Sequence, residues 1–217
     1  MNTNSDLQQK VTQELLWDPS LDSSHIGVAV KEGIVTLTGY VTSYFEKKIS
    51  ERIVKRVANV KAVVDELDVK LPGSSERSDL DIAESALLAL QLHVLVPRDR
   101  VQLIVEDGRV TLDGEVDWHY QRAAAEDALK SMLGVKGILN KIIVKPPVKA
   151  SDIRAKIQSA IMRNAQLDAN HISIETEGGT VILGGHVQSW AEKEQAEAAA
   201  WSAPGITKVE NNIGIGI

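Results

Sequence analysis

The chain of 217 residues contains no cysteine, which excludes disulfide bonds and metal sites built on cysteine ligands. No apolar run approaches the length of about 18 residues that a membrane-spanning helix needs. Residues 1–6 lack the basic and apolar stretches of a secretory signal peptide. We therefore expect a cytoplasmic location, or a periplasmic one if this start belongs to a mature or re-engineered N-terminus.

The charge and the motifs that are missing exclude further classes of protein. A net charge of −6 argues against a dedicated nucleic-acid-binding protein. None of the five histidines has the spacing of a zinc motif, and the sequence has no nucleophile elbow, phosphate-binding loop or dinucleotide fingerprint. Paired catalytic groups are missing as well. We expect a protein that is not an enzyme, needs no metal or other cofactor and has no nucleic-acid partner.

A short phrase that occurs three times is the most informative feature present. Residues 32–39, 107–114 and 178–185 share an apolar alternation framed by glycines. The repeat divides the chain into modules of about 70 residues, near the lower size at which a single core is stable. The expected module boundaries are 1–72, 76–146 and 149–217.

One module can be interpreted element by element. Leu7, Val11 and Leu15 recur every four residues and form one apolar face of a helix. Two alternating stretches joined by a two-residue link then predict a tight β-hairpin. A second helix and a last strand follow. The predicted fold class is α+β, with three tandem α-β-β-α-β modules, each having two helices packed on one face of a small three-stranded sheet.

Recurring residues mark the boundaries of these elements. A serine that begins Ser-Asp-Leu or Ser-Asp-Ile is the expected N-cap of the first helix at Ser5, Ser78 and Ser151. The hairpin links suit type I′ turns, whose central residues need positive φ. The glycines expected to shape these turns, at the start and the end of each phrase, are Gly33, Gly39, Gly108, Gly114, Gly179 and Gly185.

This order of elements, with Gly-x-Val-Thr-Leu-x-Gly in the hairpin and a closing motif before the last strand, resembles the BON domain of bacterial osmotic-stress and nodulation-related proteins. The closing motif runs from Gly134 to Asn140 and from Gly205 to Asn211, whereas the first copy has Asp65 in place of the asparagine. The resemblance implies a non-enzymatic, transport-associated module that binds phospholipid surfaces or other envelope components and is often induced by osmotic stress.

A cluster of positive charge lies on the second helix of the first module. Lipid phosphates are one expected ligand for these side chains. The alternative is a solvated helix face, stabilised by ion pairs such as Glu51 with Lys55. The candidate lipid- or anion-binding residues are Lys47, Lys48, Arg52, Lys55 and Arg56.

Aromatic residues gather just after each hairpin, although aromatics make up only 4% of the chain. They are candidates for an interfacial anchor or a partner patch. Alternatively, they form a hydrophobic staple at the start of the second helix. The residues concerned are Tyr44, Phe45, Trp118, Tyr120 and Trp190.

In the first helix of the second module, expected to begin at Ser78, the apolar residues from Ile82 through Val96 surround most of the axis. A helix of this kind is buried on several sides. We therefore expect Leu87, Leu88 and Leu92 to lie at an interface with another module or another subunit, or against a lipid-like partner.

Two functions follow from the sequence and the resemblance. The first is a non-catalytic, stress-associated protein with three BON-like modules that binds anionic phospholipid or cell-envelope components. The alternative is a soluble, self-associating scaffold or protein–protein interaction module. The expected partners are an anionic membrane surface, a protein or a second copy of the chain.

Overall fold

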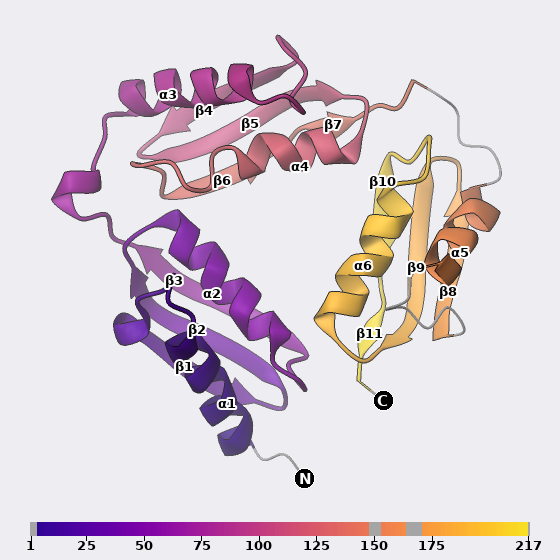
Figure 1. The fold of residues 1–217 in the computed structure, drawn as a ribbon, viewed down its shortest axis with the longest axis horizontal. Coiled ribbons are helices and arrows are strands. Elements are labelled where there is room, and N and C mark those ends of the chain that lie inside the picture. Colours follow the sequence, from indigo (N-terminus) through magenta and orange to yellow (C-terminus); the bar gives the residue numbers. More distant parts are fainter. Residues whose placement is uncertain (1–3, 148–152, 164–170, 217) are drawn as a thin grey trace. The chain divides into compact units, whose positions relative to one another are not determined.

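The structure is a computed structural model that describes residues 4–147, 153–163 and 171–216. The chain divides into two compact units (Figure 1). The first unit consists of the residues up to Glu115 together with Tyr120–Ile142, and the second of Val116–His119 together with the residues from Ile143 onward.

The first module contains two helices and a three-stranded sheet in the order β1-β2-β3 (Figure 1). Strand β2 pairs antiparallel with β1 and parallel with β3. The second helix provides the crossover that a parallel pair requires. The elements are α1 (Asn4–Trp17), a short 3₁₀ turn (Ser23–His25), β1 (Ile26–Lys31), β2 (Ile34–Val41), α2 (Tyr44–Arg56) and β3 (Ala62–Val69).

The other two modules repeat this plan, with the last strand divided into two short segments. In the second module the elements are α3 (Asp79–Leu92), β4 (Val101–Glu106), β5 (Arg109–Val116), α4 (His119–Asp127), β6 (Gly137–Asn140) and β7 (Ile143–Val144). In the third they are α5 (Ile153–Arg163), β8 (Ile172–Glu177), β9 (Thr180–Val187), α6 (Trp190–Trp201), β10 (Lys208–Asn211) and β11 (Gly214–Ile215). A 3₁₀ turn, Gly73–Ser75, lies before α3.

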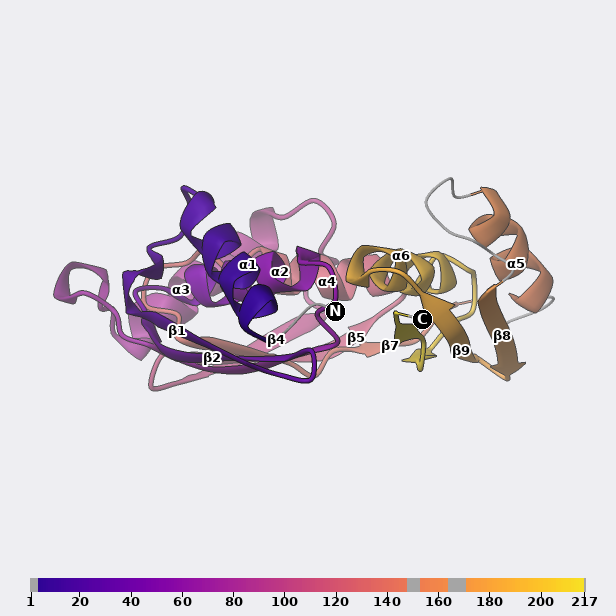
Figure 2. The ribbon, with the colours of Figure 1, turned by 90° about the horizontal axis from the view of Figure 1, so that it is seen from below.

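Within each module both helices lie on one side of the sheet (Figure 2). The first-helix residues Leu7, Val11 and Leu15 are buried, and so are Val35 and Leu37 of β2 beneath them. The same two-layer core recurs in the third module around α5 and β9. The predicted α+β class with three tandem modules is confirmed.

The repeated Ser-Asp pair does not mark equivalent core positions in the first and second modules. In α3 the buried residues are Ile82, Ala86 and Leu90, whereas Leu80, which follows the repeated Ser-Asp, is 67% exposed. Burial and the hairpin spacing therefore pair Leu7 with Ile82. A backbone contact agrees, because the N–H of Glu32 donates to Asn4 (3.1 Å) as that of Asp107 does to Asp79 (2.9 Å).

The N-cap prediction holds for one of the three serines. Ser78 caps α3 in a reciprocal arrangement with Asp81: the Ser78 hydroxyl accepts the N–H of Asp81, and the Asp81 carboxylate accepts the N–H of Ser78. Ser5 is wrong as a cap, because α1 already includes Asn4. Ser151 lies outside the described residues.

The hairpin turns agree with the prediction in two copies out of three. The central residues have positive φ in the first two, at 53° for Glu32 and 85° for Gly33, and at 51° for Asp107 and 76° for Gly108. In the third copy Gly178 has the positive φ (57°) and Gly179 does not, so that part of the prediction is wrong. A Gly-Gly link also permits a type II′ turn, which needs positive φ only at its first central residue.

Candidate binding surfaces

In the second and third modules an asparagine ties the last strand to the second helix. The Asn140 amide donates to the carbonyl oxygen of Arg122 (3.0 Å) and to the Glu126 carboxylate (3.3 Å), and its oxygen accepts the N–H of Ile142 (3.2 Å). Asn211 makes the same three contacts with Lys193, Glu197 and Ile213. The side chain that bridges the last strand thus holds a helix carboxylate in place.

The first module has a different arrangement because a carboxylate replaces this amide. Asp65 still accepts the N–H of Leu67 (3.0 Å), but it has no hydrogen to donate to the helix. Lys47 compensates, with its ammonium group 3.5 Å from Asp65 and hydrogen-bonded to the carbonyl oxygen of Leu67. The helix carboxylate, Glu51, is released to other partners.

Glu51 pairs with two lysines of its own helix, Lys48 at 3.1 Å and Lys55 at 2.8 Å. Burial would raise the pKa of the Glu51 carboxyl, but the hydrogen bonds and charges of Lys55 and Lys48 outweigh burial and leave this pKa below its usual value. Burial lowers and Glu51 raises the pKa of the Lys48 ammonium group, with a net increase. Both effects favour the charged pair.

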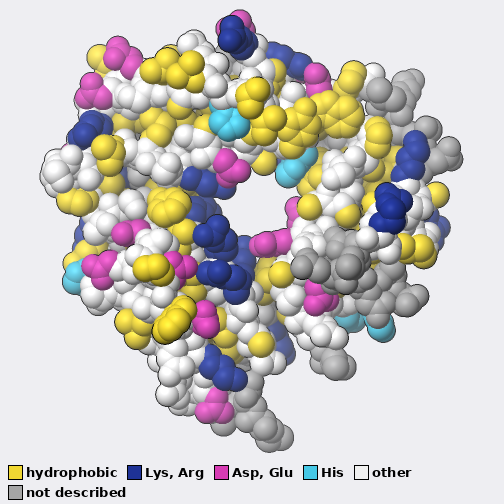
Figure 3. Space-filling model, viewed as in Figure 1, with side chains coloured by type: hydrophobic (Ala, Val, Ile, Leu, Met, Phe, Trp, Pro, Cys, Tyr) yellow, Lys and Arg dark blue, Asp and Glu magenta, His cyan; other side chains and the backbone are white. Residues whose placement is uncertain are grey.

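The charge of the second helix differs strongly between the copies. Helix α2 has five cationic residues against Glu46 and Glu51. By contrast, α4 has one arginine against two carboxylates, and α6 has one lysine against three. Lys and Arg side chains gather beside α2 in Figure 3. The excess of positive charge is therefore specific to the second helix of the first module.

The five candidate cations are not equally available. Lys47 is committed to Asp65 and Leu67, as described above. Arg56 lies 3.4 Å from Asp18, and Lys55 pairs with Glu51. Arg52 is exposed and has no ion pair among the residues that the structure describes. The C-terminal half of α2, with Arg52, Lys55 and Arg56, presents the positive charge to solvent.

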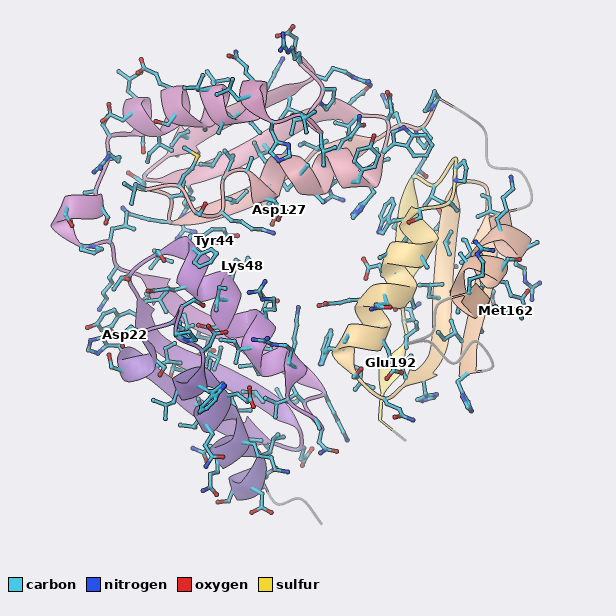
Figure 4. All side chains as sticks on the ribbon, in the orientation of Figure 1. Asp22, Tyr44, Lys48, Asp127, Met162 and Glu192 are labelled. Atoms are coloured by element: carbon cyan, nitrogen blue, oxygen red, sulfur yellow. The ribbon has the colours of Figure 1, made fainter. Side chains whose placement is uncertain are left out.

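The N-terminal half of α2 contacts the second module, within the first unit. Tyr44 is only 6% exposed and accepts a hydrogen bond from the backbone of Ile138. Burial raises the pKa of the Tyr44 hydroxyl, and the nearby charges of Lys48, Glu126 and Lys130 act on it. Figure 4 places Tyr44 and Lys48 along α2, on the side toward the end of α4 that carries Asp127.

The other aromatic candidates have different surroundings. Phe45 and Tyr120 are 39% and 53% exposed. Trp118 and Trp190 are half-buried, and the Lys193 ammonium group lies 5.4 Å from the centre of the Trp190 ring. The exposures and contacts of the aromatics thus differ, and whether any of them binds a partner remains a prediction.

Helix α3 is covered on one side only. Leu87, Leu88 and Leu92 are 44%, 55% and 76% exposed, so they lie outside the core of their own module. The helix also ends at Leu92, short of the expected Val96. Pro97 disfavours helical geometry at Val96, so the proline accounts for that residue alone and not for the end of the helix at Leu92. Whether another module, another subunit or a lipid-like surface covers these leucines remains a prediction.

Neither a metal-binding cluster nor a membrane-spanning helix is found in the described part of the chain. Residues 4–147, 153–163 and 171–216 contain no group of three or more His, Asp or Glu side chains arranged to hold a metal ion. Over the same ranges, no helix has the length and hydropathy needed to cross a bilayer.

Two known bacterial proteins are similar in sequence to parts of this chain. Osmotically-inducible protein Y of Escherichia coli (strain K12) is 30% identical over 146 residues, which cover 65% of this chain and 73% of that protein. An uncharacterised protein in the gshII 5′ region of Anaplasma centrale is 31% identical over 112 residues, which cover 48% of this chain and 74% of that protein.

Solved structures are more distant. A structure of CdsD, a structural protein of the type III secretion system of Chlamydia trachomatis, aligns over 97% of this chain and 92% of that chain, with 16% identity and a TM-score of 0.27. So low a score carries no argument about function. The family comparison is decisive, because the BON domain matches residues 3–70, 78–146 and 149–216, and the chain therefore belongs to the BON domain family, with three tandem copies.

Proposed function

We propose that this protein is a non-catalytic binding protein of the osmotic-stress response, and that its ligand is an anionic phospholipid surface or a similarly charged envelope component. The stress association rests on the similarity to osmotically-inducible protein Y. The absence of paired catalytic groups in the sequence supports binding in preference to catalysis.

One observation carries the choice of ligand. The chain has a net charge of −6, yet α2 has five cationic residues against two carboxylates, while the equivalent helices α4 and α6 have more carboxylates than cations. The module fold thus does not require this charge. Basic side chains close to an anionic membrane each contribute about 1 kcal/mol of attraction.

The contacting residues of this proposal are Arg52, Lys55 and Arg56. Lys47 and Lys48 contribute less, because the first is tied to β3 and the second lies beside Tyr44 near the second module. The ion pairs of Lys55 with Glu51 and of Arg56 with Asp18 reduce the attraction of those two cations. Arg52 therefore contributes most of the attraction to the anionic surface, and Lys55 and Arg56 contribute less.

Flotation of the full chain with vesicles tests the proposal. The protein should float with phosphatidylcholine vesicles that contain phosphatidylglycerol and not with phosphatidylcholine alone, and binding should fade as salt shortens the Debye length from about 10 Å. Replacing Arg52, Lys55 and Arg56 by Gln should weaken the affinity about ten- to hundredfold, since about 1 kcal/mol per residue is an upper value for paired cations.

A matched control separates the site from net charge. Replacing Lys10, Lys31 and Lys61 by Gln removes the same charge from exposed positions elsewhere in the first module. This variant should bind the vesicles about as well as the unmodified protein. Equal loss in both variants would contradict a site on α2, and failure of the unmodified chain to float with either vesicle would contradict the proposed ligand.

A further inference from the structure

Helix α3 exposes a row of leucines that the module fold does not use. Leu80, Leu87, Leu88 and Leu92 are 67%, 44%, 55% and 76% exposed. The buried contacts to the sheet come from the opposite side of the helix, which Ile82 represents. We name these four leucines the α3 leucine face. Val94 and Leu95, just beyond the helix, are exposed at 92% and 47% and extend it.

The other two modules have different residues at the same positions. Aligning the buried residues of the first helices places Thr12, Gln13 and Trp17 of α1 at the positions of Leu87, Leu88 and Leu92. In α5 the same positions are occupied by Gln158, Ser159 and Arg163. Polar residues thus fill two of the three positions in α1 and all three in α5. The leucines of α3 are therefore a property of this copy and not a requirement of the fold.

We propose that the α3 leucine face binds the same face of a second copy of this chain, with the two α3 helices antiparallel about a twofold axis between Leu87 and Leu88. In a twofold interface the same patch must be complementary to itself. This axis places Leu87 opposite the partner copy's Leu88, and Leu80 opposite the exposed Val94 and Leu95 of the partner copy.

The distribution of charge favours this partner. At the N-terminal end of α3 the carboxylates of Glu76, Asp81 and Glu84 outnumber Arg77, and just after its C-terminal end Arg98 and Arg100 outnumber Asp99. Asp79 is engaged within its own module, where it accepts the N–H groups of Asp107 and Gly108. An antiparallel pair brings the acidic end of each helix toward the basic turn of the other. A parallel pair would instead place like charges together, and an anionic lipid surface would repel the acidic residues.

The antiparallel register also gives each polar residue within the α3 leucine face a polar residue to face in the other copy. Glu84 and Gln91 lie on the same side of α3 as the leucines, and the twofold axis places each opposite the other. A carboxylate facing an amide can accept a hydrogen bond, whereas Glu84 facing Glu84 would be repulsive. The proposal does not depend on α2 or on lipid binding.

Mass measurement and a substitution test the interface. Sedimentation equilibrium of the full chain should give a dimer, about twice 23.6 kDa, that dissociates on dilution. Replacing Leu87 by Gln, Leu88 by Ser and Leu92 by Arg, the residues of α5 at these positions, should raise the dissociation constant at least about tenfold. As a control, replacing Ile104 and Leu139 by Thr removes exposed apolar side chains from the sheet (60% and 55% exposed). This variant should leave the dissociation constant of the dimer unchanged.

Because the chain has no cysteine, disulfide trapping can test the register. A mixture of the single variants Glu84→Cys and Gln91→Cys should form a mixed disulfide-linked dimer under mild oxidation. Each variant alone should not, since two equivalent positions lie about 10 Å apart along the axis at about 1.5 Å per residue, beyond the Cα separation of about 7 Å that a disulfide spans.

Three results would overturn the proposal. The first is a monomer at every concentration, and the second is efficient cross-linking of Glu84→Cys with itself, which indicates parallel helices. The third is a monomer whose flotation with neutral phosphatidylcholine vesicles is lost in the leucine variant, which assigns the face to lipid. The leucine variant should retain the circular dichroism spectrum of the unmodified chain, so that lost association is not lost folding.

Discussion

Replacing Asn140 by Asp should destabilise the second module, although the two side chains have nearly the same shape. Asn140 donates to the carbonyl oxygen of Arg122 (3.0 Å) and to Glu126 (3.3 Å). A carboxylate cannot donate either bond and adds a negative charge beside Glu126. The bond that its oxygen accepts from the N–H of Ile142 should remain.

The magnitude follows from these contacts. A neutral hydrogen bond contributes about 1 kcal/mol and one to a charged group about 1.5 kcal/mol or more. The carboxylate repulsion is reduced by solvent, because the Glu126 side chain is 28% exposed. We therefore expect a loss of about 2–3 kcal/mol. The loss should shrink as the pH falls, since a neighbouring carboxylate raises the pKa of the new aspartate, and the protonated form again donates a hydrogen bond.

Hydrogen exchange measured by mass spectrometry suits this test, because unfolding of a chain with several modules is not a two-state process. Amides of α4 and β6 should exchange about 30- to 150-fold faster in the Asn140→Asp variant at neutral pH. Peptides of α1 and β1 in the same sample provide the internal control. The converse variant, Asp65→Asn, should change the opening free energy that exchange reports for the first module by less than about 1 kcal/mol, because it removes a partly exposed ion pair. Equal protection of Asn140→Asp and the unmodified chain would refute the reasoning.

Two further perturbations follow from the structure. Gly114→Ala should destabilise the second module by at least about 2 kcal/mol, because Gly114 has a φ of 132° and a Cβ would overlap the carbonyl oxygen of Arg100, whereas Gly73→Ala, with open space around it, should be neutral in the same exchange measurement. Glu51→Gln should remove part of the acid sensitivity of the first module: the folded pKa of Glu51 lies below its unfolded value of about 4.3, so its contribution is present above that pH and is lost as the pH falls through the folded pKa. After correction for the intrinsic pH dependence of exchange, the amides of α2 should lose protection below about pH 4.3 in the unmodified chain. The variant should lose less protection over the same pH range.

The sequence predicts the hairpins well because their backbone geometry restricts the residues allowed. Few side chains tolerate positive φ, so Asp107-Gly108 marks a turn wherever it separates two alternating stretches. The same logic fails at Gly178-Gly179, where either residue accepts either conformation. A motif made of two residues with identical freedom does not determine which one adopts the positive φ.

The position of a helix cap does not determine which residues of the helix are buried. Ser78 caps α3, yet the leucine that follows its Ser-Asp pair faces solvent. The repeated tripeptide records where a helix begins, and the buried positions depend on the turn that faces the sheet. The spacing from the hairpin, and not from the cap, makes Ile82 equivalent to Leu7.

The contacts of α2 could not be predicted from the sequence, because they join residues that are distant along the chain. The exchange of asparagine for Asp65 is visible in the closing motif, but its consequence appears only when Lys47 and Glu51 are seen to change partners. Tyr44 offered no such signal. Its burial depends on the backbone of Ile138, which belongs to another module.

The three copies keep the residues that the fold uses and differ at the positions that it leaves exposed. The buried first-helix positions are aliphatic in every module, from Val11 in α1 to Ile157 in α5. On the exposed positions the first module gathers cations on α2, and the second gathers leucines on α3. A change at an exposed position alters what the surface binds at little cost to the core. One module that already folds can therefore carry different surfaces, cationic on α2 in the first copy and apolar on α3 in the second.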